Sequence, residues 1–340
     1  MDQSLFFLII FLPSVFGNSL DPNMKILNMN SKGMTCIDYD TLNQLKKLEK
    51  ITFTRGNMSY FPDKDCNNPA HEEDNRPLDL PNLEIFSLFS LNLLKAPNPS
   101  LMPKLQKFKV PGSRITHMHG TPFANNEQLS VIGLTKNQLS VAPNLTGGCK
   151  NLDELNMQDN YITSSDVDYF QGCNIKQINL NRNKLTKFPN FAPLADSVNY
   201  IYVDSNEIFG TITNEMVKDL RNLVQLNIQE NDLQGVDASF CQTSQPIEIN
   251  VNQNPDLAYF ENPYRFCTHL LDAFSIKPKM VLTSTQIPCD HHRCWMKKLA
   301  SKFTIQADNC PDGRDWSALT ETDVCGQGLF PQLIDSFFSG

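Results

Sequence analysis

Three kinds of pattern are missing from this chain of 340 residues. No run of Lys and Arg clusters positive charge, and the formal net charge of −8 argues against a nucleic-acid partner, which needs a basic face. No long apolar stretch follows the first residues, so we expect neither a membrane span nor a lipid anchor. The sequence also lacks a G-x-S-x-G nucleophile motif and a G-x-x-x-x-G-K phosphate loop. We therefore expect no enzyme activity and no cofactor.

The first residues have the pattern of a secretion signal. Leu5 to Pro13 is an apolar run that is too short to span a bilayer, although no Lys or Arg precedes it. Val15 and Gly17 are small enough for cleavage after Gly17, so we expect a signal peptide over residues 1–17 and a secreted, extracellular protein. Acceptor sequons at Asn57 and Asn144 agree with secretion and predict two glycosylation sites.

An apolar pattern recurs through the middle of the chain. Five rows fit the template L-x-x-L-x-L-x-x-N, and a sixth fits except at its first position, which is Pro246. The last positions of the six rows are Asn137, Asn160, Asn183, Asn206, Asn231 and Asn254. The intervals between these asparagines are 23, 23, 23, 25 and 23 residues, which chance does not maintain. Weaker rows at 48–56, 83–91 and 105–113 precede the six, and one at 271–279 follows them. The repeat therefore covers about ten turns with degenerate ends.

The template has a direct physical reading. Its L-x-L core is a short strand with both apolar side chains on one face, and successive strands stack in parallel. The asparagine amide has donors and an acceptor for backbone groups where the chain turns, so stacked asparagines form a buried ladder with a structural role.

The template is typical of leucine-rich-repeat proteins. The resemblance implies an α/β fold: a horseshoe-shaped solenoid with a parallel concave sheet, an irregular convex side and disulfide-bonded caps. We place an N-terminal cap at 18–44, the repeats at 45–285 and a C-terminal cap at 286–340.

Ten cysteines in a secreted chain predict disulfides. Cys149 and Cys173 occupy nearly the same place on consecutive turns, about 5 Å apart, which suits a bridge. The same logic predicts Cys241–Cys267, and Cys36–Cys66 brackets the first strand and its long loop.

The last four cysteines resemble the C-terminal flanking module of extracellular leucine-rich-repeat proteins. The matching residues are Pro288, Cys289, Cys294, Trp295, Cys310 and Cys325. That family usually has one residue between its first two cysteines, whereas this chain has four. The resemblance implies the pairs Cys289–Cys310 and Cys294–Cys325. The Cys-Trp pair and the segment at 309–313 are also similar to arthropod secreted members, a group that includes the non-catalytic leucine-rich-repeat subunit of a shrimp luciferase.

Two histidine clusters invite a metal-binding interpretation. Cys289, His291, His292 and Cys294 are all zinc-ligand types. In an oxidising compartment the downstream cysteines favour disulfides instead, and we expect no metal here. His117 and His119 alone do not complete a site.

The variable positions between the apolar residues point to the concave face. They are polar and mostly uncharged, with many Asn and Gln. Tyr200 and Tyr202 stand out as aromatic anchors, a residue type enriched in binding hot spots. Together with Asp204 and Arg182 they form the predicted centre of a binding surface. The alternative is that the amides only hydrogen-bond to one another.

Fold alone does not fix function, so the expected function comes from the family resemblance. The resemblance implies a secreted binding scaffold that recognises an extracellular protein or glycan through its concave face. An alternative is a non-catalytic subunit, or an inhibitor, of a secreted enzyme complex such as a luciferase-type oxygenase. A third is a receptor ectodomain.

Overall fold

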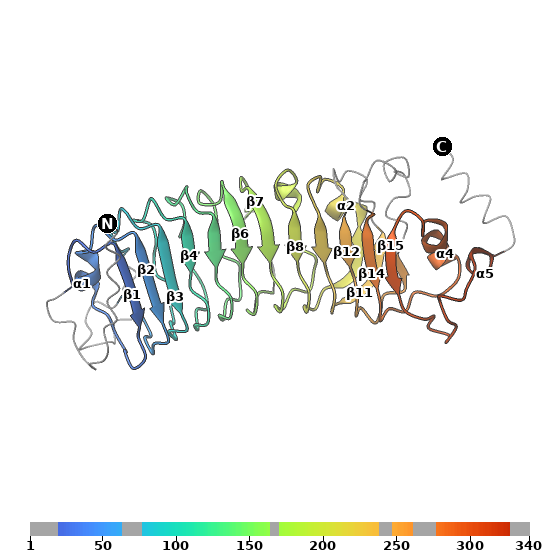
Figure 1. The fold of residues 1–340 in the computed structure, drawn as a ribbon, viewed down its shortest axis with the longest axis horizontal. Coiled ribbons are helices and arrows are strands. Elements are labelled where there is room, and N and C mark those ends of the chain that lie inside the picture. Colours follow the sequence, from blue (N-terminus) through green and yellow to red (C-terminus); the bar gives the residue numbers. More distant parts are fainter. Residues whose placement is uncertain (1–19, 63–76, 164–169, 238–246, 261–276, 327–340) are drawn as a thin grey trace, which may run out of the picture. The chain divides into compact units, whose positions relative to one another are not determined.

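The computed structural model describes residues 20–62, 77–163, 170–237, 247–260 and 277–326 (Figure 1). They belong to two compact units, one of residues 1–162 with 168–175 and the other of 163–167 with 176–340. The signal peptide expected at 1–17 lies outside the described residues. Within the described ranges, no helix is both long and apolar enough to cross a bilayer.

The first unit contains a parallel sheet. Its strands, in spatial and sequence order, are β1 (Ile26–Asn30), β2 (Lys50–Thr54), β3 (Ile85–Phe89), β4 (Lys107–Lys109), β5 (Val131–Gly133) and β6 (Leu152–Asn156). Inward-facing residues stack from strand to strand, as Phe86 does on Phe108 with ring centroids 5.5 Å apart. The weak rows at 48–56, 83–91 and 105–113 thus form strands, as predicted.

The N-terminal cap contributes a strand that the repeat template does not predict. β1 pairs in parallel with β2, and the cap also holds the short helix α1 (Tyr39–Asn43). Leu27 is buried in β1, but Lys32 stands where the template has asparagine. The sheet therefore begins before Leu48, where the sequence analysis starts the array.

The second unit contains parallel strands of the same kind. They are β7 (Ile175–Asn179, whose first residue belongs to the first unit), β8 (Tyr200–Tyr202), β10 (Gln225–Asn227), β12 (Glu248–Asn250), β14 (Lys279–Leu282) and β15 (Thr304–Ala307). In register, Leu226 lies between Ile201 and Ile249, and all three are buried.

One predicted row is misplaced. The last row is expected at 271–279, but the strand that pairs with β12 on this side is β14, with Met280 and Leu282 buried. Thr285 occupies the position of the asparagine, so this row does not match the template. Residues 271–276 lie outside the described residues.

The side of the second unit away from this sheet is more regular than expected. Three strands, β9 (Phe209–Thr213), β11 (Asp232–Asp237) and β13 (Tyr259–Phe260), form a second parallel sheet. Short helical turns, η2 (Ala192–Leu194) and α2 (Asn214–Val217), accompany them. The irregular convex side expected from the family is thus partly replaced by strands in this unit.

The asparagine ladder is present and buried. Asn137, Asn160, Asn183, Asn206, Asn231 and Asn254 are all at most 8% exposed. Nδ2 of Asn231 donates to the carbonyl oxygen of Ile228 in its own turn and to that of Val203 one turn earlier. Its Oδ1 accepts the backbone N–H of Ile208. Each such amide saturates backbone groups that have no strand partner, which confirms the predicted structural role.

A left-handed backbone conformation, which was not predicted from the sequence, accompanies the ladder. The residue just before each of these asparagines has a left-handed backbone with φ of 53–56°. These residues are Lys136, Asp159, Arg182, Ser205, Glu230 and Gln253. None is glycine, although glycine adopts this conformation at the lowest cost. The tight turn therefore carries a side chain in every one of these repeats.

The C-terminal cap is built on two helices and two disulfides. In α4 (His291–Lys298), Trp295 donates from its indole N–H to the carbonyl oxygen of Phe260 at 2.9 Å. Cys294 packs with Val324 and Cys325 of α5 (Glu321–Cys325), with Trp316 against them.

The structure forms the disulfides Cys149–Cys173, Cys289–Cys310 and Cys294–Cys325, with Cα atoms 4.8, 5.5 and 4.8 Å apart. Cys66, Cys241 and Cys267, needed for the other two expected pairs, lie outside the described residues, and Cys36 is itself disulfide-bonded.

Candidate binding surface on the parallel sheet

The alternation of β8 directs Tyr200, Tyr202 and Asp204 to the outer side of the sheet. Ile201 and Val203 between them are completely buried. Because successive side chains of a strand point to opposite faces, the three residues form one row along the strand, on one face of the sheet. We call Tyr200, Tyr202, Asp204 and Arg182 the tyrosine surface.

The two tyrosine rings form a parallel pair. Their centroids are 6.5 Å apart and their planes differ by 9°. Tyr200 is 37% exposed, whereas Tyr202 is half-buried and donates its hydroxyl proton to Oε1 of Gln225 at 2.9 Å. Burial raises the pKa of Tyr202, and Tyr200 and Glu248 add to the rise. The pair thus forms an aromatic step in which the ring of Tyr200 is exposed and that of Tyr202 is held in place by Gln225.

Asp204 is a buried acid at the edge of this step. Its backbone N–H donates to Oδ1 of Asn181 at 3.0 Å, and its Oδ1 accepts from Nδ2 of Asn227 at 3.1 Å. Burial raises the pKa of Asp204, and the nearby negative charge of Glu230 adds to the rise. The positive charge of Arg182 opposes it. A buried carboxyl group with a raised pKa costs stability in its ionised form, which makes Asp204 a functional-site candidate.

Arg182 reaches this site from the neighbouring turn. It is exposed, has a φ of 53°, and donates its backbone N–H to the carbonyl oxygen of Asp204 at 2.9 Å. The structure therefore brings all four predicted residues together. Gln225 and Asn227, which fix Tyr202 and Asp204, are neighbours that the sequence analysis did not single out.

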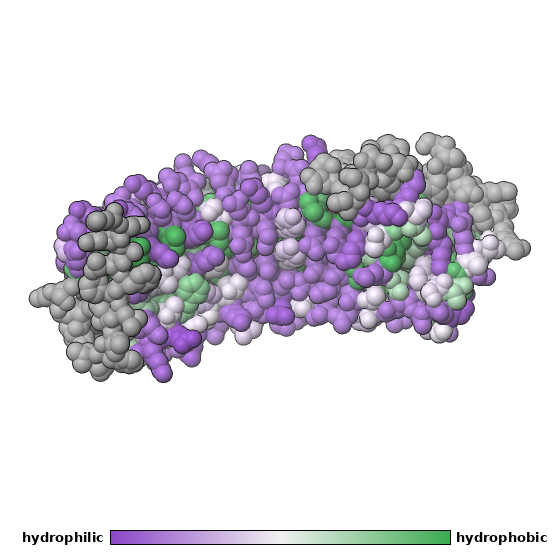
Figure 2. Space-filling model, viewed as in Figure 1, coloured by the Kyte–Doolittle hydropathy of each residue, from purple (hydrophilic) through white to green (hydrophobic). Residues whose placement is uncertain are grey.

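Amide side chains continue the polar row across the next strands. Nδ2 of Asn250 donates to Oε1 of Gln229 at 2.8 Å, and the hydroxyl of Thr283 donates to Oδ1 of Asn252. The amides therefore bond to one another, as one of the two interpretations expects, while Tyr200 stays exposed. Binding of a partner at this surface stays a prediction. Figure 2 shows that the face over β8 to β12 is largely hydrophilic.

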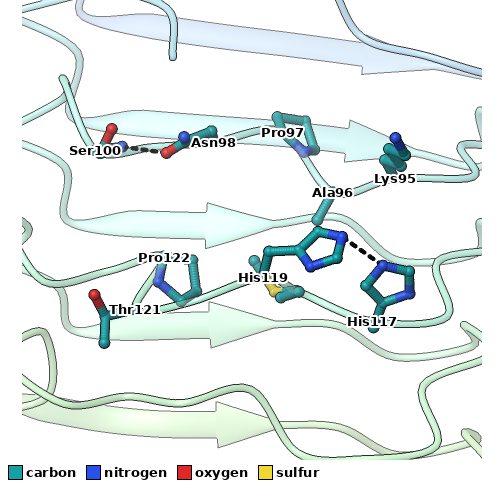
Figure 3. Close-up of a pocket in the computed structure, with 10 residues that line it drawn as sticks. Lys95, Ala96, Pro97, Asn98, Ser100, His117, His119, Thr121 and Pro122 are labelled. Atoms are coloured by element: carbon teal, nitrogen blue, oxygen red, sulfur yellow. Dashed lines mark hydrogen bonds between the residues drawn. The ribbon is translucent and has the colours of Figure 1, made fainter. Parts of the chain in front are cut away.

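A recess lies on the first unit, around His117 and His119 (Figure 3). Their Nε2 atoms are 2.6 Å apart, and Nδ1 of His117 lies 2.8 Å from the hydroxyl of Thr116. Burial lowers the pKa of His117, and the charges of His119 and Lys95 lower it further. The cavity volume is about 200 Å³. Because ligand pockets usually exceed about 300 Å³, this recess is a weaker candidate than the tyrosine surface.

The cysteines of the C-terminal cap are not available to a metal. Cys289 and Cys294 are both in disulfides, so the thiolate ligands considered in the sequence analysis are excluded.

The sequon asparagines differ in access. Asn57 is exposed and accepts a hydrogen bond from Asn92, whereas Asn144 is half-buried and accepts one from the backbone of Thr146. Glycosylation at either position stays a prediction.

Comparison with known proteins supports the fold. Residues 103–162 match the family model described as leucine rich repeat. No curated protein matches the chain. A chain in an octameric complex of Latrophilin 3, Unc5D and FLRT2, the last marked as a leucine-rich-repeat part, is 13% identical with a TM-score of 0.55. The match covers 92% of this chain and 91% of that one.

Two further structures are similar. A chain of the Toll–Spatzle complex, from Drosophila, is 14% identical with a TM-score of 0.54, over 89% of this chain and 51% of that chain. The leucine-rich-repeat domain of APL1B is 12% identical with a TM-score of 0.54, over 84% and 78%. At these identities the likeness concerns the fold alone. It confirms the predicted leucine-rich-repeat solenoid with a parallel sheet.

Proposed function

We propose that this leucine-rich-repeat chain is a secreted binding scaffold that recognises an extracellular protein through the tyrosine surface. The observation that carries the proposal is the pair of Tyr200 and Tyr202 beside the buried acid Asp204. Tyrosine contributes strongly to binding hot spots because it buries a large apolar ring and keeps a polar hydroxyl. Beside the rings, the buried carboxylate of Asp204 accepts from Asn227 and holds that amide in place.

The surroundings favour a protein over a nucleic acid. The row around the tyrosines is made of amides and hydroxyls, and the chain has a formal net charge of −8. A phosphate backbone needs a basic face instead. The structures with similar folds include Toll in complex with Spatzle, and FLRT2 in complex with Latrophilin 3 and Unc5D. Disulfides within the repeats and the C-terminal cap support an oxidising, extracellular setting.

The proposal is tested by capture from extracellular fluid, with the wild-type chain and two variants as bait. Tyr200→Ala/Tyr202→Ala removes both rings of the tyrosine surface. Tyr161→Ala is the matched control, because Tyr161 is 55% exposed and belongs to the first unit. We expect one partner, identified by mass spectrometry, to bind the wild type and Tyr161→Ala equally.

Binding to the double variant should be at least about tenfold weaker, which corresponds to a loss of ~1.4 kcal/mol. Equal binding by all three baits contradicts the tyrosine surface as the binding centre. A glycan array run with the same baits distinguishes a carbohydrate partner. A captured enzyme in stoichiometric amount indicates the alternative role, a non-catalytic subunit or inhibitor.

A further inference from the structure

Three potential metal ligands converge at the start of α4. Oδ1 of Asp290 lies 2.7 Å from Nδ1 of His292 and 3.7 Å from Nδ1 of His291. All the ligand atoms of this group lie within 4.8 Å of one another. The rings of His291 and His292 have centroids 4.0 Å apart. One carboxylate and two imidazoles therefore lie close together, and Nδ1 of His292 is hydrogen-bonded to Oδ1 of Asp290.

The backbone beneath this group is firmly held. Asp290 caps the helix by accepting the backbone N–H of His292 at 3.0 Å. Cys289 and Cys294, in separate disulfides, flank the segment. Arg293, only 1% exposed, donates to the carbonyl oxygens of Ile287 and Asp308. A site on such a backbone needs little ordering when an ion binds.

The spacing suits a small divalent ion. Bond lengths of about 2.0–2.2 Å to nitrogen and oxygen in a tetrahedral site place ligand atoms roughly 3.3 Å apart. The two Asp290–histidine separations, 2.7 and 3.7 Å, lie on either side of that value. Side-chain shifts of about half an ångström therefore bring both contacts to bonding geometry.

The ligand types and their exposure to solvent indicate which kind of ion the group would bind. Two imidazoles and a carboxylate suit zinc, copper and nickel, whereas calcium and magnesium take oxygen ligands. The side chains of Asp290, His291 and His292 are 47%, 53% and 35% exposed, so an ion enters from solvent and further coordination positions remain open.

Two charges near the group oppose a cation, and both are compensated. Arg314 contacts this segment by donating to the carbonyl oxygen of Cys289 at 3.0 Å, but Asp312 pairs with its guanidinium at 2.8 Å. The positive end of the helix dipole is faced by the carboxylate of Asp290.

We propose that Asp290, His291 and His292 form a surface site for one late first-row divalent metal ion, with Zn²⁺ or Cu²⁺ as its occupant. From the sequence, no metal is expected here, because the neighbouring cysteines favour disulfides. Asp290 is a ligand that the cysteine and histidine pattern does not include. The proposal is independent of the tyrosine surface.

The test titrates the chelator-treated full chain with ZnCl₂, and separately with CuCl₂, in a calorimeter. We expect one site in the wild type and at least about a tenfold weaker affinity in His291→Ala/His292→Ala, since losing even an outer-shell partner costs that much. His117→Ala/His119→Ala is the matched control, because it removes the other histidine pair and should bind as the wild type does.

Asp290→Asn separates ligation from folding, since asparagine also caps helices well but carries no negative charge. Its affinity should also fall at least about tenfold, with an unchanged circular dichroism spectrum. Zinc-edge X-ray absorption should show a first shell of nitrogen and oxygen only. The proposal is overturned if the wild type binds neither ion, if the His291/His292 variant binds as tightly as the wild type, or if sulfur scatters in the first shell.

Discussion

Asn206 donates a hydrogen bond from Nδ2 to the carbonyl oxygen of Leu180, 26 residues earlier in the chain, at 3.1 Å. The same nitrogen also donates to the carbonyl oxygen of Val203 in its own turn. Oδ1 of Asn206 accepts the backbone N–H of Leu185 at 3.1 Å. One buried amide thus replaces the backbone partners that two successive turns lack where the chain leaves the sheet.

Asn206→Ala should destabilise the second unit substantially. The change leaves buried carbonyl and N–H groups without partners, and each costs about 1–3 kcal/mol. We expect a loss of about 2–4 kcal/mol in the free energy of unfolding, measured by urea titration with circular dichroism. Asn222→Ala is the control, because its amide donates near the surface to Asp196 and its loss should cost within about 1 kcal/mol. Equal losses in the two variants contradict the ladder.

Lys136→Val should lower the stability of the chain, because Lys136 lies in the left-handed turn. Lys136 has a φ of 55° and an exposed side chain, so its replacement tests backbone conformation and little else. A β-branched residue tolerates this conformation poorly, and we expect a loss of about 1–3 kcal/mol. Lys136→Asn should be neutral or slightly stabilising, since asparagine tolerates it. Lys107→Val, in the extended backbone of β4, should cost nothing, and thermal unfolding of the three variants compares them.

Asp204→Asn should raise stability at neutral pH. Burial raises the pKa of Asp204 in the folded chain, so its neutral form favours folding and its ionised form opposes it. The stability that the acid contributes is present below its unfolded pKa of about 3.9 and is lost as the pH rises through the folded pKa. The asparagine variant should therefore gain stability at pH 7 and lose that advantage towards about pH 3.5.

Urea midpoints at the two pH values measure the effect of Asp204→Asn. Asp196→Asn is the control, because the side chain of Asp196 is 86% exposed. An advantage of Asp204→Asn that stays constant from acid to neutral pH argues against the assigned burial effect.

Removing the bridge between Cys149 and Cys173 should loosen the first unit. The two residues are 24 apart in sequence, and a loop of this length gives a disulfide about 3 kcal/mol of stabilisation through the unfolded state. Cys149→Ala/Cys173→Ala should therefore unfold at a lower urea concentration than the wild type under non-reducing conditions. An unchanged midpoint shows that the bridge does not restrain the unfolded chain as described.

The interior of the repeats could be predicted from sequence because one physical requirement recurs at a fixed interval. Leu155 and Leu180 are buried where the template puts them, and Asn160 bonds where the amide was expected. Each turn needs buried apolar residues and an asparagine at the same positions, so one row that fits the template well predicts where the adjacent rows lie.

The ends could not be predicted in this way. β1 and β14 lack the asparagine, and β15 belongs to a cap in which disulfides and Trp295 supply the packing. There the template fails because other contacts replace it. The left-handed turn was missed for a different reason: residues such as Glu230 and Lys136 give no glycine signal.

The candidate site was only partly visible in the sequence. Strand alternation is sufficient to place Tyr200 and Tyr202 on one face. The raised pKa of Asp204 depends on its burial and on the charge of Glu230. Its carboxylate accepts from Asn227, 23 residues later, so both features require the three-dimensional stacking of turns. Asp290 was missed as a ligand because its capping role is set by the helix that begins after it.

The ladder also limits how such a chain can change length. Asn160 and Asn231 each bond to the equivalent carbonyl of the turn before, so a complete turn added or removed within a unit reproduces the same bonds at the new junction. A partial turn leaves an amide facing the wrong atoms. Insertions and deletions in the repeats should therefore be accepted in whole turns of about 23 residues, the spacing typical of this repeat class, and elsewhere only in the outer loops.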